Sequence, residues 1–296
     1  MELYQLKGFV AVAESGHLTR AADKLHVSQP ALSAQVKAVE DELGVTLFER
    51  TPSGMALSSA GRKLLPHAQA VVAAAQALRN AAHAIEGELA GQVKVGTVAD
   101  PNFVRLPQFL ARAVERHPLL EIMLQHEVSG EAFDKVRDDA LDASFYYGDR
   151  THPHVASLHL TDFAYRIVAP IKWRDRVDGK AFHDIALLPW IMTPGISTHR
   201  ALTRRLFDEN GVEPATRIEA DHEAVISSLV VAGLGVSLMR EDQAEAHVKA
   251  GDVCLWDGTR LVTSLQFLYA REREEEPVIA ALAGIVRDVW PAAAAR

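Results

Sequence analysis

Residues 28–44 read SQPALSAQVKAVEDELG, and this stretch predicts a helix with a defined start and end. The Ser28 hydroxyl can accept an amide proton of the first turn, where the missing N–H of Pro30 is tolerated. Apolar side chains then recur at helical spacing, and they are Leu32, Val36, Val39 and Leu43. Gly44 predicts the C-terminal end of the helix. We expect the apolar stripe to face a core.

The opposite face of this helix is polar. It carries Gln29, Ser33, Lys37 and Glu40. Gln and Ser side chains can bond to base edges in DNA, and Lys can reach a phosphate. Taken alone, such a face is more simply explained by exposure to water, so the flanking segments must decide between the two interpretations.

The flanking segments predict a winged helix-turn-helix. Upstream, we expect helices at 3–14 and 18–25, followed by a tight turn into the helix described above. Downstream, short strands at 47–50 and 55–57 enclose the tip TPSG, in which Pro and Gly favour a turn. A hairpin at this place would form the wing.

The stretch FVAVAESGHLTRAADKLHVSQPALSAQVKAVEDELGVTLFERTPSGMALSSAG resembles the N-terminal domain of LysR-type transcriptional regulators. The match covers essentially all of residues 1–65 in order and spacing. The resemblance implies that the helix beginning at Ser28 enters the major groove of operator DNA. It implies DNA-facing positions for Thr19, Ser28, Gln29, Pro30, Ser33 and Lys37, with Arg50 and Ser53 on the wing side. Ala34 departs from the family, which often has Arg there, so no operator sequence is predicted.

A long helix is expected over 59–88, after a cap at Ser58 or Ser59. Its apolar seam follows a heptad pattern, with members at Leu64, Ala68, Val71, Ala75, Leu78, Ala82 and Ile85. An alanine-rich linker helix without a partner is the alternative. The seam favours pairing of two chains, and the resemblance likewise implies a dimer through this helix and often a tetramer.

Beyond residue 89, segments typical of strands and helices alternate as β-α-β-α-β and then repeat. This alternation predicts parallel sheets flanked by helices. The fold class is therefore α+β multidomain: a winged helix-turn-helix over 1–58, a dimerisation helix over 59–88 and a two-lobed α/β domain over 89–296. We expect one lobe at about 92–162 with 269–296, and the other at about 163–268.

Loops at the carboxyl ends of these strands are the places where such sheets bind ligands. More weakly, LPQFLARAVERHPLLEIML and VVAGLGVSLM resemble the effector-binding domain of LysR-type regulators, which has a periplasmic-binding-protein-like fold. The resemblance implies a small molecule between the lobes. The expected lining is Thr97, Val98, Ala99, Asp100, Asn102, Ser129, Tyr146, Thr193, Pro194, Gly195, Ser197, Thr198 and Ile226.

Two residues depart from the family pattern in this domain. Asp100 places a carboxylate in the first cleft loop, and Arg240 stands where Pro is common. Tyr146 and Tyr147 add ring surface near the expected cleft. We therefore expect an effector with an aromatic or amine part.

Composition excludes several classes of protein. The net charge is −8, and residues 1–90 carry 8 basic and 9 acidic side chains, so DNA contact must come from placed charges. A single cysteine, Cys254, excludes a disulfide within one chain. No signal peptide or membrane-spanning run is apparent, which predicts a cytoplasmic protein.

No enzyme motif is present, so we expect no catalytic activity, no cofactor and no metal. His152, His154 and His159 could ligate a metal in principle, but loop histidines are usually solvated. The expected partners are operator DNA, a small-molecule effector, a second copy of the chain and RNA polymerase. The alternative is a small-molecule binding protein whose N-terminal domain makes contacts other than with DNA.

Overall fold

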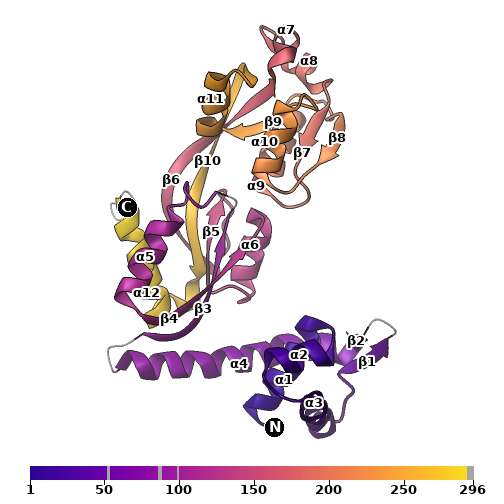
Figure 1. Cartoon of the computed structure of the whole chain (residues 1–296), viewed down its shortest axis with the longest axis vertical. Coiled ribbons are helices and arrows are strands. Elements are labelled where there is room, and N and C mark those ends of the chain that lie inside the picture. The colour runs from indigo at the N-terminus through magenta and orange to yellow at the C-terminus, as the bar shows by residue number, and fades with distance from the viewer. Residues whose placement is uncertain (52–53, 86–88, 99, 292–296) are drawn as a thin grey trace. The chain divides into compact units, whose positions relative to one another are not determined.

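The computed structural model describes residues 1–51, 54–85, 89–98 and 100–291. The chain forms two compact units, 1–87 and 88–296 (Figure 1). The finer division at residue 58 and the lobe boundaries within the second unit stay predictions.

The first unit begins as a helix-turn-helix. Its helices are α1 (Leu3–Ser15), α2 (Leu18–Lys24) and α3 (Gln29–Leu43). Ala21 and Ala22 are buried, which lets α2 lie close to its neighbours. The core also contains Leu6, Phe9, Val12, Leu32, Val36, Val39, Leu47, Phe48 and Ala68.

Both predicted ends of α3 are present. The Ser28 hydroxyl accepts a hydrogen bond from the Ala31 amide at 3.3 Å, and Gly44 follows the helix at φ 68°. The prediction that Leu43 belongs to the core is wrong, because this side chain is 42% exposed. Leu43 is the last helical residue, and the buried stripe of α3 ends one turn earlier at Val39.

The wing is an antiparallel hairpin of β1 (Phe48–Thr51) and β2 (Gly54–Leu57). Glu40 joins α3 to this hairpin, since its carboxylate accepts the Leu47 amide at 2.7 Å and the Phe48 amide at 3.3 Å. Glu40 therefore has a structural role, although its place in the helical pattern suggested a free polar face.

Helix α4 (Ser59–Ile85) is capped by Ser58, whose hydroxyl oxygen accepts the Gly61 amide at 2.9 Å. The predicted seam is divided along this helix. Leu64 and Ala68 pack on the core of the first unit. Val71 and Leu78, in contrast, are 49% and 73% exposed. The side chains of Ala82 and Ile85 lie outside the described residues.

The second unit starts with the predicted β-α-β-α-β order. These elements, with the last helix of the chain, form what we call the first lobe: β3 (Ala90–Thr97), α5 (Leu106–Arg116), β4 (Leu119–His126), α6 (Ser129–Arg137), β5 (Ala143–Tyr147) and α12 (Pro277–Val289). Strand β3 pairs in parallel with β4 and β5. Figure 1 shows α5 and α12 on one face of the sheet and α6 on the other.

The elements of the second lobe follow from residue 171. They are η1 (Ile171–Trp173), α7 (Arg174–Val177), α8 (Phe182–Ala186), β7 (Trp190–Met192), α9 (Thr198–Glu209), β8 (Thr216–Glu219), α10 (Glu223–Val231), β9 (Ser237–Arg240) and α11 (Glu241–Ala250). Strands β7 and β8 form a parallel pair. A short turn, η2 (Arg271–Arg273), precedes α12.

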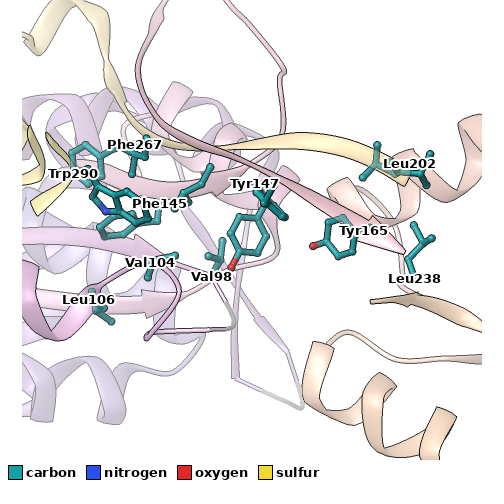
Figure 2. Packing of buried hydrophobic residues seen from close by; sticks show 14 of the residues in the cluster. Val98, Val104, Leu106, Phe145, Tyr147, Tyr165, Leu202, Leu238, Phe267 and Trp290 are labelled. Atoms are coloured by element: carbon teal, nitrogen blue, oxygen red, sulfur yellow. The ribbon is translucent and has the colours of Figure 1, made fainter. Parts of the chain in front are cut away.

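Two long antiparallel strands, β6 (Val155–Pro170) and β10 (Val253–Ala270), pass through both lobes. They complete a six-stranded sheet with the order β4-β3-β5-β10-β6-β9. One hydrophobic cluster follows these strands from lobe to lobe. In Figure 2, Tyr147 and Tyr165 lie between Phe145 of the first lobe and Leu238 of the second. The hydrophobic core is therefore continuous between the two lobes.

Candidate DNA interface and effector site

The start of α3 presents polar side chains to solvent. Gln29 and Lys37 are exposed, while Ser33 is half-buried. Thr19 of α2 donates a hydrogen bond to the Gln29 side-chain oxygen at 3.4 Å, so residues from both helices meet here. Ser28 keeps its capping bond, and Pro30 and Ala34 are exposed beside it. The face can offer amide and hydroxyl groups to base edges.

Positive charge on this face is sparse. The Lys37 amine lies 3.3 Å from the Asp41 carboxylate one turn along α3, and both side chains are exposed. Such a surface pair is weak, so Lys37 can exchange Asp41 for a phosphate. Arg50 lies in β1 opposite Met55, and Ser53 lies outside the described residues.

The first expected cleft loop follows β3. Thr97 ends the strand, Val98 is buried and Asn102 is exposed, while Ala99 lies outside the described residues. The Asp100 carboxylate accepts the backbone amides of Asn102 at 3.0 Å and Phe103 at 3.1 Å. Asp100 thus shapes the loop before α5, besides any part in binding.

The loop at residues 193–198 touches the first lobe. Thr198 donates a hydrogen bond to the Tyr147 carbonyl oxygen, and Gly130, next to Ser129, abuts the Ile196 carbonyl so closely that no larger side chain fits. Within the loop, the Thr193 and Ser197 hydroxyls are 2.5 Å apart, and Ser197 caps α9. Pro194 is half-buried and Gly195 is exposed beside them. The structure therefore brings the Ser129, Tyr146–Tyr147 and 193–198 positions together.

The two tyrosines lie on opposite faces of β5, because neighbouring residues alternate along a strand. Tyr146 packs against Phe133 of α6, with ring centroids 5.5 Å apart. Tyr147 joins Phe103 and Phe163, with centroids at 5.9 and 4.9 Å. The expectation that both rings lie near the cleft stays a prediction, and of the two only Tyr147 belongs to the aromatic group around Phe103 and Phe163.

Arg240 is the centre of a polar cluster that the sequence did not predict. Its guanidinium donates to Asp100 at 2.6 Å and to Asp242 at 2.6 and 2.8 Å. It also lies 3.9 Å over the Phe103 ring and 3.4 Å from the Tyr147 hydroxyl. Burial acts to lower the pKa of Arg240, but the bonds to Asp242 and Asp100 outweigh it and raise this pKa. The side chain is a permanent cation between the lobes.

Glu223, the first residue of α10, lies on the other side of Arg240. Its Oε1 accepts the Tyr165 hydroxyl at 2.8 Å, and its Oε2 is 3.9 Å from the guanidinium. Among the described residues Oε2 has no hydrogen-bond partner. Burial raises the pKa of this carboxyl above its usual range. Burial also acts to raise the pKa of Asp100, but the bond and charge of Arg240, together with the backbone amides of Phe103 and Asn102, outweigh it and lower this pKa.

A cavity of about 10 Å³ adjoins this cluster, which is room for about one water molecule. Tyr165, Glu223, Ile226, Arg240 and Gln243 are among its lining residues. Ile226, an expected cleft residue, thus reaches this cavity while it packs in the core of the second lobe. Apart from Tyr165 of β6, the lining residues belong to the second lobe.

Metal ligation and membrane insertion find no support in the described residues. No group of three or more His, Cys, Asp and Glu side chains there is placed to hold a metal ion. His152 and His154 lie with ring centroids 5.4 Å apart, and His159 pairs with Asp162 at 2.6 Å. No described helix is long and apolar enough to cross a membrane.

The fold and the two candidate sites define a DNA-binding protein with a ligand-binding α/β domain. Residues 3–62 match the family model of the bacterial regulatory helix-turn-helix protein, lysR family, and residues 86–291 match that of the LysR substrate binding domain. The chain belongs to the LysR family of transcriptional regulators, with a helix-turn-helix DNA-binding domain and an effector-binding domain.

Relatives and solved structures agree with this membership. The HTH-type transcriptional regulator ShiR of Corynebacterium glutamicum is 32% identical over 80% of this chain and 82% of its own. A probable hydrogen peroxide-inducible genes activator of Streptomyces viridosporus is 29% identical over 97% of this chain and 95% of its own. A full-length OxyR variant from Pseudomonas aeruginosa superposes with a TM-score of 0.67 at 25% identity, over 97% of this chain and 95% of that one.

The fold is also that of CbnR in complex with its target DNA, with a TM-score of 0.64 at 24% identity over 97% and 99% of the two chains.

Cys254 is the single cysteine of the sequence, so a mechanism that needs two cysteines in one chain is excluded. It is buried, its thiol faces the Ala169 and Pro170 carbonyls, and burial raises its pKa.

Proposed function

We propose that the protein binds an operator with the exposed start of α3. The observation that supports this best is the joint presentation of Thr19 and Gln29, 3.4 Å apart, beside the capped N-terminus of a helix whose other face packs on the core. Gln29 supplies base discrimination, which for such a contact is about 1–3 kcal/mol. Ser28, Pro30 and Ser33 complete the face. Lys37, Arg50 and Ser53 supply contacts to the DNA backbone.

The second unit supplies regulation in this proposal. An effector binds between the lobes at the Thr97–Asn102, Ser129, Tyr146, Thr193–Thr198 and Ile226 positions and changes the angle between them. Dimers form through α4 and pair into tetramers, so the effector alters how the heads meet the DNA and RNA polymerase. Because the partner is the chromosome, we place this action in the cytoplasm and assign the chain no catalytic step.

A gel shift with the DNA directly upstream of the gene tests the DNA-binding proposal. We expect wild type to retard this fragment more strongly than a random fragment of equal length. The Gln29→Ala/Ser33→Ala variant loses this difference, because it retains phosphate contacts but lacks two groups that face the bases. A matched control is Asp23→Ala, which alters one exposed residue on α2 of the same domain.

Equal loss of affinity on both fragments would contradict the role of Gln29 in discrimination. An intact dimer that binds a ligand but shifts no DNA at low salt, and selects no fragment from genomic DNA, would favour the rival function of a binding protein without an operator.

A further inference from the structure

We propose that the effector carries a protonated amine, which binds in the cleft to the carboxylates of Glu223 and Asp100. The inference rests on the proposed function, in which the cleft binds an effector, and it names the chemistry of that effector. Four observations on the Arg240 cluster support it.

The first observation is the local charge. One guanidinium, that of Arg240, faces three carboxyl groups: Asp100 at 2.6 Å, Asp242 at 2.6 Å and Glu223 at 3.9 Å. Among the described residues that line the adjoining cavity, Arg240 is the only permanent cation. A second cation relieves repulsion between these carboxylates, whereas an anionic ligand adds to it.

The second observation is the vacant acceptor on Glu223. Its Oε2 is buried without a hydrogen-bond partner among the described residues, and Glu223 is one of the residues that line the small cavity. A buried polar atom without a partner is destabilising, so a ligand that brings an N–H donor gains from meeting it. Neither a carboxylate nor an apolar group offers that donor.

The third observation is the aromatic surface around the cation. The Arg240 guanidinium lies 3.9 Å from the centroid of Phe103, and Phe103 contacts Tyr147 edge to face. Tyr165 lies near Tyr147 (Figure 2), and its hydroxyl donates a hydrogen bond to Glu223. Aromatic faces attract cations, so the walls that hold Arg240 also suit an ammonium group.

The fourth observation is that Arg240 can release Asp100 and still remain paired. Two of its hydrogen bonds go to Asp242, its near neighbour at the start of α11. Asp100 belongs to the first lobe, whereas Arg240, Glu223 and Asp242 belong to the second. An amine that binds Asp100 in place of Arg240 thus breaks this contact between the lobes. The lobes can then separate at this point and enlarge the space next to the small cavity. The Asp100–Arg240 pair occupies the site until the ligand arrives.

Calorimetry on the full-length protein with two probes tests the inference. Phenethylamine and phenylacetate share a ring and a short chain but carry opposite charges. We expect the amine to bind at millimolar concentration and the acid to show no heat of binding. Glu223→Gln weakens amine binding at least tenfold, because it keeps the shape of the side chain and removes its charge. Glu245→Gln, on the exposed side of α11, leaves the affinity unchanged.

Binding of phenylacetate in place of the amine would overturn the inference, and so would unchanged amine binding by Glu223→Gln or the absence of binding by both probes. If Glu223→Gln does not fold, Asp100→Asn is measured instead, with the same expected loss. The gel shift separates this result from the proposed function. A specific gel shift without amine binding would support the proposed function and contradict the amine effector. Amine binding without a specific gel shift would contradict only the proposed DNA-binding function.

Discussion

At the scale of single residues, His199 shows how burial sets chemistry in the second lobe. Its Nε2 is 3.1 Å from the Leu238 carbonyl, and its Nδ1 is 3.3 Å from the Thr193 hydroxyl. The carbonyl can only accept, so Nε2 carries the proton and Nδ1 accepts from Thr193. Burial lowers the pKa of His199 to about 4. The ring is therefore neutral at neutral pH and holds the 193–198 loop against β9.

This pKa predicts a loss of stability in acid. Unfolded His199 takes up a proton near pH 6.5, whereas the folded ring does so only near pH 4. The unfolded state binds more protons between these values, so the free energy of unfolding decreases as the pH falls through this window, by up to about 3 kcal/mol. Urea unfolding of wild type and His199→Gln at pH 7 and pH 5 measures the effect as the difference in pH dependence.

His183→Gln, which replaces an exposed histidine on α8, is the matched control and should keep the wild-type pH dependence. Because other groups titrate over the same range, only the difference between the variants reports on His199. Identical pH dependence in wild type and His199→Gln would contradict the burial argument.

Local signals at this scale were predictable and distant pairings were not. Ser28 and Gly44 could be assigned as caps because each acts on amides or carbonyls within its own turn. Asp100 and Arg240 each depart from the family pattern in the sequence, but they are 140 positions apart, and only the fold shows the hydrogen bond between them. Glu223 carries no signal in the sequence, since the burial of its Oε2 beside Tyr165 and Arg240 depends on contacts between distant segments.

At the scale of elements, α4 shows one heptad pattern with two uses. The early part of its seam, at Leu64 and Ala68, packs on the core of the first unit. The later part exposes Val71 and Leu78, which a single chain leaves uncovered among the described residues. Sequence periodicity identified the stripe but could not divide it, because periodicity does not reveal which neighbour covers each turn.

The exposed part of the apolar seam of α4 predicts a dimer. Two acidic side chains introduced there should abolish it. Val71→Asp/Leu78→Asp places carboxylates on the apolar stripe, and like charges from the two chains would then be buried together. We expect the mass measured by light scattering to fall to that of one chain. Gln69→Asp/Ala73→Asp places the same groups on the opposite, exposed side of α4 and should leave the dimer intact. Unchanged mass for the first variant would contradict pairing through α4.

Strands were less predictable than helices in extent. Residues 162–171 read DFAYRIVAPI, which by itself predicts a strand of that extent, whereas β6 runs over Val155–Pro170 and pairs along its length with the long strand β10. Two lobes were expected from the repeated alternation of elements, and a shared pair of strands between them was not. The difference arises because cross-strand pairing extends a strand through residues that have no alternating pattern of their own.

At the scale of the whole molecule, a regulator needs its ligand site and its DNA site to affect each other. Coupling of this kind requires that the ligand has different affinities for two arrangements of the chain. In the proposal above, the Asp100–Arg240 contact would give the second unit two such arrangements, one with the pair made and one with Asp100 bound to a ligand. We propose that the exposed seam of α4 forms the dimer through which a change in one chain reaches the DNA.

Selection of bound fragments from genomic DNA tests the central claim most directly. The purified protein and its Gln29→Ala/Ser33→Ala variant are each mixed with sheared DNA of the source organism, and the retained fragments are sequenced. We predict that wild type enriches a small set of fragments that share a roughly two-fold symmetric motif, and that the variant enriches none. A folded, dimeric wild type that retains all fragments equally would contradict the claim that α3 reads an operator.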